Sequence, residues 1–207
     1  MGGRLEASTQ SFSYPIAVHV RKHGPSGYAD YGLYRDWLRD EFSFCCVFCR
    51  KREQWDIMIG SWDIDHFVPQ DIRPDQKLDY ENLLYVCHAC NLIKSKKIAP
   101  DPCAIAFGAC VEIHEDGSID ALNEDGQALI ETLKLDNEDH RKYRRLIIAT
   151  LRSLAIHDMQ VYRLWMCYPE DLPDLSRLNP PSGNTRPSGV IDCFFARRAR
   201  GELPETY

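Results

Sequence analysis

The sequence lacks any long hydrophobic run. A membrane-spanning helix needs roughly 18 to 20 consecutive apolar residues, and no segment of the 207 residues approaches that length. The N-terminus also lacks a basic region followed by an apolar one, which is the pattern of a secretory signal peptide. We therefore expect a cytoplasmic protein that does not enter a membrane.

The sequence also lacks an excess of positive charge. Its net charge is −6, which excludes a protein that adheres to phosphate backbones through its overall charge. Any surface that binds nucleic acid must therefore be local. The composition, with 44% hydrophobic and 27% charged residues, is close to the globular average and predicts a folded chain.

Cysteine, in contrast, is abundant. The chain has 9 cysteines, and an odd number without a signal peptide favours metal binding over a disulfide framework. Four of them form the Cys-x-x-Cys pairs Cys46–Cys49 and Cys87–Cys90. Two residues between thiolates let one turn point both sulfurs at one ion, so two such pairs predict a tetrahedral zinc site. Because four protein ligands leave no open position, this zinc is expected to be structural.

Two neighbours of these pairs are expected to be bystanders. Neither Cys45 nor His88 gives the two-residue spacing within its pair. The cysteines outside the pairs are expected to fill the core as small hydrophobic residues, and they are Cys45, Cys103, Cys110, Cys167 and Cys193. A redox switch built on Cys45, Cys46 and Cys49 is the competing interpretation, and it predicts that no zinc is tightly bound.

Apolar periodicity predicts the elements of the first half of the chain. Residues 28–42 carry aromatic and apolar side chains at three-to-four spacing, which predicts an amphipathic helix. A hairpin is expected around residues 62–69. A short helix is expected from about Cys90, ended by Pro100 and Pro102.

The second half of the chain is expected to be mainly helical. An Asp116-Gly117 turn within residues 111–119 predicts a hairpin. Helices follow at about 124–135 and 138–157, and the second carries a stripe of arginines, namely Arg141, Arg145 and Arg152. After residue 168 the many prolines predict an extended tail on the surface.

A further set of residues lies between and just after the cysteine pairs. They are Asp65, His66, Pro69, Asn82, Asn91, Lys94 and Lys97. Framed by the two cysteine pairs, this pattern resembles the HNH nuclease family over roughly residues 43–98. The third letter of the family name departs here, because Asn91 stands where the founding pattern has histidine.

The resemblance implies a hairpin and a helix wrapped around one divalent ion. It assigns Asp65 and Asn91 as ligands of that ion, His66 as the general base and Asn82 as the residue that orients the histidine-bearing loop. An asparagine ligand offers a neutral oxygen, which favours Mg²⁺ or Mn²⁺ over a soft transition metal. With an ordinary pKa of about 6.5, a histidine can accept a proton from water near neutral pH.

The resemblance also implies a nucleic-acid partner. Lys94 and Lys97 are three residues apart on the expected helix and could bind flanking phosphates. One ion and one base cut one strand per visit, so cleavage of both strands would need a homodimer, a protein partner or a second encounter.

These expectations combine into an α+β fold. A ββα-metal nuclease core with zinc knuckles is expected at 43–100, after an N-terminal segment and helix at 1–42. Residues 101–207 are expected to form an accessory hairpin, a helical lobe that docks a partner or clamps DNA, and a Pro-rich tail.

The predicted function is hydrolysis of phosphodiester bonds in DNA, or RNA, by a metal-dependent endonuclease. By resemblance, compact proteins of this layout look like effectors of bacterial defence against phage or plasmids. The alternative is a non-catalytic zinc module that binds nucleic acid or a protein. Such a module would not depend on His66, so replacing that residue distinguishes the two.

Overall fold

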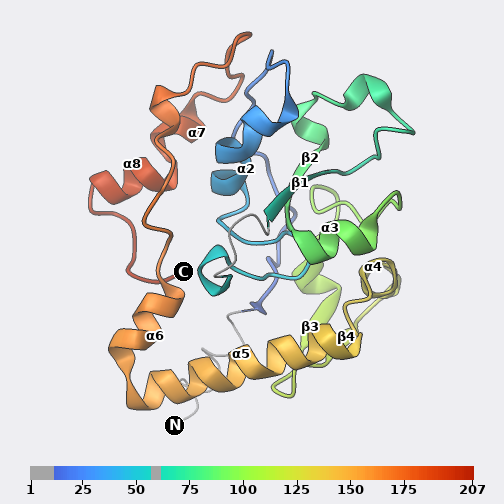
Figure 1. The fold of residues 1–207 in the computed structure, drawn as a ribbon, viewed down its shortest axis with the longest axis vertical. Coiled ribbons are helices and arrows are strands. Elements are labelled where there is room, and N and C mark those ends of the chain that lie inside the picture. Colours follow the sequence, from blue (N-terminus) through green and yellow to red (C-terminus); the bar gives the residue numbers. More distant parts are fainter. Residues whose placement is uncertain (1–11, 57–61) are drawn as a thin grey trace.

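The structure is a computed structural model that describes residues 12–56 and 62–207. It combines helices with two small antiparallel sheets, which confirms the expected α+β class. Among the described residues, no helix has the length and apolar character needed to cross a membrane. Figure 1 shows the elements, which are α2 (Arg35–Glu41), β1 (Trp62–His66), β2 (Leu83–Cys87), α3 (His88–Lys94), β3 (Val111–Ile113), β4 (Ile119–Ala121), α4 (Glu124–Leu133), α5 (Glu138–His157), α6 (Met159–Met166), α7 (Ser188–Ile191) and α8 (Phe194–Ala199).

Strands β1 and β2 form a hairpin that runs directly into helix α3. The strands pair antiparallel, with Trp62 opposite Cys87 and His66 opposite Leu83. The expected hairpin around residues 62–69 is therefore only half right, because the partner of β1 lies beyond a long connection, residues 67–82. The first part of this connection turns at Pro69, whose carbonyl accepts hydrogen bonds from the N–H groups of the residues three and four positions later.

Helix α3 is short and ends abruptly. It begins at His88 and ends at Lys94, well before the prolines that were expected to end it. Ser95 follows with φ 48° and ψ −122°, and its N–H donates to the carbonyl of Asn91. An L residue rarely adopts this conformation, and a helix cannot continue through it.

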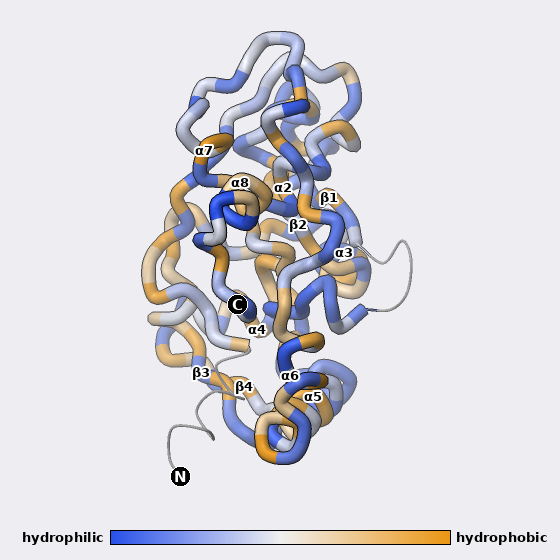
Figure 2. Tube along the Cα trace, turned by 90° about the vertical axis from the view of Figure 1, so that its left-hand side faces the viewer, coloured by the Kyte–Doolittle hydropathy of each residue, from blue (hydrophilic) through white to orange (hydrophobic). Residues whose placement is uncertain are grey.

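One hydrophobic core joins the hairpin to its surroundings. Phe48, Val86 and Leu129 belong to one buried cluster. The sequence analysis assigned Phe48 and Val86 to the nuclease core and Leu129 to the accessory region. Trp37 of α2 joins this cluster from the N-terminal side. Figure 2 shows apolar residues through the middle of the molecule around β2 and α2. Packing therefore crosses both of the expected boundaries, at 42/43 and 100/101.

The accessory hairpin and the two helices after it lie where the sequence predicted them. Gly117 takes φ 80° in the turn between β3 and β4, which glycine adopts without steric cost. The side chain of Asn123 caps α4, and that of Asn137 caps α5 by accepting the N–H of His140. These caps satisfy N–H groups that have no partner within the helix.

Three arginines of α5 contact the accessory hairpin. Arg141 pairs with Asp116, and Arg152 lies 2.8 Å from Glu115. Arg144 is buried and donates to the carbonyls of Gly117 and of a residue in the α4–α5 connection. Most of the positive charge on this helix therefore ties it to β3–β4, near the lower end of the molecule in Figure 1.

The C-terminal region contains an unpredicted helix, α6, and then the expected irregular tail. After residue 168 its α-helices are short, as the prolines require. The tail returns to the N-terminal segment, where the N–H of Ser26 donates to the carbonyl of Gly183 and the N–H of Thr185 donates to the carbonyl of Gly24.

The carboxylate of Glu41, at the end of α2, holds the N-terminal segment in place. It accepts the backbone N–H groups of Lys22 (2.8 Å) and His23 (3.1 Å) and the hydroxyl of Tyr80 (3.0 Å). Its Oε1 also lies 2.8 Å from Nε2 of His19. Burial alone would raise the pKa of this carboxyl group, but the hydrogen bonds from His19 and Lys22 outweigh burial and lower the pKa to about 2.

The substitution Glu41→Gln should change how stability depends on pH. A pKa lowered in the folded state stabilises the fold above the unfolded value of about 4.5, and this contribution disappears as the pH falls through about 2. We expect the free energy of unfolding of the wild type to fall between pH 5 and pH 2 more steeply than that of Glu41→Gln. Urea unfolding at several pH values measures it. The exposed Glu112→Gln, on β3, should follow the wild type; equal slopes for all three proteins would contradict the assignment.

Candidate metal centre and active site

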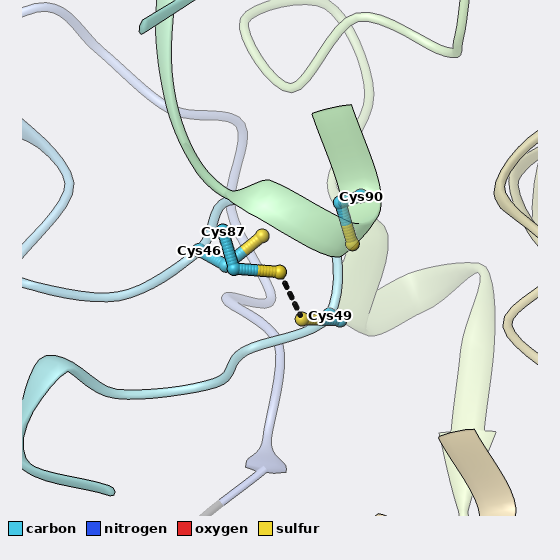
Figure 3. A group of neighbouring side chains, drawn as sticks. All are labelled: Cys46, Cys49, Cys87 and Cys90. Carbon is cyan, nitrogen blue, oxygen red and sulfur yellow. Dashed lines mark hydrogen bonds between the residues drawn. The ribbon is translucent and has the colours of Figure 1, made fainter. Parts of the chain in front are cut away.

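The four paired cysteines converge on one point. Their sulfurs all lie within 4.8 Å of one another, and all four side chains are buried. Figure 3 shows the pair Cys46 and Cys49 approaching Cys87, at the end of β2, and Cys90, in α3. The sulfurs of Cys49 and Cys87 are 3.6 Å apart, close to the edge of about 3.8 Å that zinc–sulfur bonds of about 2.3 Å give in a tetrahedron. The cluster is therefore consistent with the predicted zinc site.

The chemistry of this donor set fits a zinc ion. Hydrogen bonds within the cluster, foremost with Cys46, lower the pKa of Cys87 and raise those of Cys49 and Cys90. Four sulfurs packed this closely and away from water need a dication if all are to be thiolates. Cys45 lies outside the cluster, as expected.

Replacing one cysteine of the cluster should remove the metal. We expect about one zinc ion per chain in protein purified without chelator. Cys90→Ala should lose most of this zinc and several kcal/mol of unfolding free energy, because metal binding and folding are coupled. Cys103→Ala, outside the cluster and half-buried, should keep its zinc. Elemental analysis and urea unfolding measure both quantities; full zinc occupancy in Cys90→Ala would exclude the four-cysteine site.

A separate cavity of about 390 Å³ lies beside the hairpin and α3. Asp65, His66 and Asn91, three of the residues assigned to the active site, all line it. The other residues of its wall are Tyr31, Ile64, Pro69, Gln70, Asp71, Ser95 and Lys96. Residues distant in sequence thus meet around one solvent-accessible space.

His66 is held in one tautomer by its neighbours. Its Nε2 lies 2.9 Å from the carbonyl oxygen of Lys77, and since a carbonyl only accepts, Nε2 carries the proton. Its Nδ1 then has the lone pair, 3.1 Å from Nε2 of Gln70. Burial is the main cause that lowers the pKa of His66 below 6.5. With its proton on Nε2, the imidazole can accept a further proton only at Nδ1, where the amide of Gln70 lies against the lone pair.

Asp65 is paired with a buried lysine. The Nζ of Lys94 lies 3.1 Å from Oδ1 and 2.9 Å from Oδ2 of Asp65, and it also donates to the carbonyl of His66 at 2.8 Å. Only the contact with Oδ1 has hydrogen-bond geometry, so the buried Oδ2 has no aligned donor among the described residues. Burial raises the pKa of Asp65 to about 6, although Lys94 opposes the shift.

Asn91 contacts a carboxylate that the sequence analysis did not select. Its Nδ2 donates to Oδ2 of Asp63 at 2.9 Å, and Nδ1 of His88 lies 2.8 Å from the same oxygen. Asp63 and Asp65 are two residues apart on β1 and so project from the same face of the strand. This spacing was the available signal for Asp63. His88 was not expected to be a zinc ligand, and its side chain instead contacts Asp63.

The segment that contains both sites was compared with known protein families. Residues 46–97 match the model of the HNH endonuclease family. The chain therefore contains an HNH endonuclease domain, and such domains indicate a nuclease that contacts nucleic acid. No curated protein matches the chain. The matched HNH domain includes both cysteine pairs and every assigned active-site residue, but not Tyr31.

Within the HNH domain, Asn82 holds the loop that follows His66. Its Oδ1 accepts the N–H of Val68 at 2.8 Å, and its Nδ2 donates to the carbonyl of Val68 at 3.0 Å. The backbone carbonyl of Asn82 also accepts the N–H of Phe67 at 2.8 Å. These contacts are consistent with the predicted orienting role.

The lysines after the second cysteine pair do not share a helix face, contrary to expectation. Helix α3 ends at Lys94, and Lys97 lies beyond the turn at Ser95. Lys94 is fully buried on Asp65, whereas Lys97 is exposed and donates to the carbonyl of Thr132. Lys96, which was not assigned, lines the cavity and pairs with Asp71.

Ser95 offers a test of the local backbone of the HNH domain. Its φ of 48° and ψ of −122° place it in a sparsely populated region that costs about 1–3 kcal/mol for an L residue but little for glycine. We expect Ser95→Gly to raise the free energy of unfolding by about 1 kcal/mol. Ser95→Ala, which keeps the Cβ atom and so the strain, should not. Urea unfolding midpoints decide this, and equal gains for both variants would contradict it.

Proposed function

We propose that this chain is a metal-dependent HNH endonuclease that hydrolyses phosphodiester bonds of nucleic acid, most of all DNA. The proposal rests on one observation. Asp65, His66 and Asn91, which all belong to the matched HNH domain, line a single solvent-accessible cavity. Metal-dependent hydrolysis of a phosphodiester uses a base and a cation that act at the same phosphate group, and this cavity brings candidates for both together.

His66 is the proposed general base. Its Nδ1 carries the lone pair that would take the proton and lies 3.1 Å from the amide of Gln70, while Nε2 donates to the carbonyl of Lys77. This hydrogen bond would stabilise the imidazolium once a proton has been taken up. In the proposed step a water molecule gives a proton to Nδ1 and its oxygen bonds to phosphorus. The bond from phosphorus to the 3′ oxygen breaks, and that oxygen takes a proton from solvent.

Asp65 and Asn91 are the proposed ligands of a divalent cation. The fit rests on the amide of Asn91 and on the buried Oδ2 of Asp65, for which residues 12–56 and 62–207 supply no aligned donor. Because Nδ2 of Asn91 donates to Asp63, its Oδ1 is the atom left for a cation. Hard oxygen donors of this kind favour Mg²⁺ or Mn²⁺. When bound, such a cation offsets negative charge on the phosphate and on the departing oxygen.

We further propose that cleavage of both strands needs a second copy or a protein partner, because one base and one cation attack one strand at a time. Residues 101–207 are the proposed docking or DNA-clamping region. The role in bacterial defence against phage or plasmids stays a prediction from the resemblance.

Replacing the base is the decisive test. We expect His66→Ala to lower the rate of plasmid cleavage in Mg²⁺ or Mn²⁺ by about 10²- to 10⁴-fold, which is what a positioned base typically contributes. Its zinc content and unfolding midpoint should stay near those of the wild type, since His66 is not among the four sulfur ligands.

His114→Ala is the matched control. His114 is a half-buried histidine outside the HNH domain that pairs with Asp120, so this variant should cleave like the wild type. Assays on circular duplex, single-stranded DNA and RNA identify the substrate. If His66→Ala cleaves as fast as the control, the non-catalytic zinc module becomes the better interpretation.

A further inference from the structure

The amide of Gln70 occupies the lone pair that the proposed base must use. Its Nε2 lies 3.1 Å from Nδ1 of His66, while Nε2 of His66 donates to the carbonyl of Lys77. We propose that Gln70 caps His66 in the substrate-free enzyme and must rotate away before His66 can take a proton from water. This inference rests on the proposed function.

The cap follows from the number of lone pairs on a neutral imidazole. With its proton on Nε2, the ring has one in-plane lone pair, on Nδ1. A hydrogen bond from Gln70 and one from an attacking water therefore compete for the same position. The water gains access only in the fraction of molecules whose Gln70 amide has left.

The imidazole itself is not free to turn toward a different water. The ring of Tyr31 lies edge-to-face against His66, with centroids 4.9 Å apart and an interplanar angle of 79°. The carbonyl of Lys77 holds the opposite nitrogen. A rotation of the ring would break both contacts, so movement of Gln70 is the less costly way to expose Nδ1.

The side chain of Gln70 is free to move. It is half-buried, and within the described residues its amide makes one hydrogen bond, the one to His66. The turn around it is held by backbone hydrogen bonds to the carbonyl of Pro69 from the N–H groups of Ile72 and Arg73. The side chain can therefore rotate while the turn stays intact.

Two substitutions separate the hydrogen bond from simple coverage. Gln70→Met keeps a side chain of similar length but removes the donor, and Gln70→Ala removes both donor and bulk. Gln127→Met is the matched control, because Gln127 is an exposed residue of α4 that bonds Glu131. Zinc content and unfolding midpoints verify that all variants fold.

The first readout is chemical and needs no nuclease activity. Diethyl pyrocarbonate modifies the free lone pair of a neutral imidazole, and peptide mass spectrometry gives the rate at His66 relative to that at His114. We expect Gln70→Met and Gln70→Ala to raise this ratio by roughly 2- to 10-fold, the range set by loss of one hydrogen bond. Gln127→Met should leave it unchanged. If only Gln70→Ala raised this ratio, the side chain would cover Nδ1 by its bulk and not through a hydrogen bond, and this result would overturn the cap.

The second readout is cleavage. Since kcat/KM compares the transition state with the free enzyme, we expect both Gln70 variants to raise kcat/KM by a similar factor. Slower cleavage by both would mean that Gln70 holds water or substrate, which overturns the cap. If the wild type does not cleave nucleic acid, the proposed function fails, whereas the modification rates at His66 still decide whether Gln70 covers its lone pair.

Discussion

The convergence of four buried sulfurs on one point is the constraint on which the rest of the HNH domain depends. Cys87 ends β2 and Cys90 lies in the first turn of α3, so the cluster fixes the junction between them. A helix of 7 residues is too short to be stable alone in water. Anchored at this junction, α3 places Asn91 opposite Asp63 and Lys94 opposite Asp65.

The pair of Lys94 and Asp65 sets the electrostatics beneath the cavity. A buried carboxylate without a counter-charge costs several kcal/mol, and Lys94 supplies that charge from the last turn of α3. Lys94 also bonds the carbonyl of His66, so one ammonium group holds two consecutive residues of β1. Burial nevertheless keeps the pKa of Asp65 raised, to about 6. Lys94 therefore offsets only part of the cost of burying this carboxylate, so a second positive charge nearby would further stabilise its ionised form.

Local patterns predicted most of the fold. The spacing within the cysteine pairs predicted their convergence, and apolar periodicity predicted α4 and α5, because these signals depend on the chain within one or two turns. The long connection between β1 and β2 was missed, since register over such a distance is set by packing. Helix α6 was not predicted, and the N-terminus of α3 was placed two residues late.

Long-range contacts explain why the site was only partly predictable. The Asp65–His66 pair could be recognised in the sequence as part of a family motif, and Asn82 and Asn91 were assigned to the site together with it. The contact of Tyr31 with His66 joins segments that no short motif links. Lys94 was read as a surface residue because a lysine in a helix is usually exposed, and only the structure shows it fully buried.

The charges around the cavity restrict how a nucleic acid could approach it. Lys94 is buried, Lys97 bonds a backbone carbonyl, and Lys96 pairs with Asp71. In this arrangement these lysines present little uncompensated positive charge, and the chain as a whole carries −6. The exposed ion pair of Lys96 and Asp71 could open at little cost, because a surface ion pair contributes only about 0–1 kcal/mol to stability. Among these three lysines, attraction for a phosphate backbone therefore depends on opening that pair, and a cation at Asp65 or a partner would add to it, whereas the net charge of the chain opposes it.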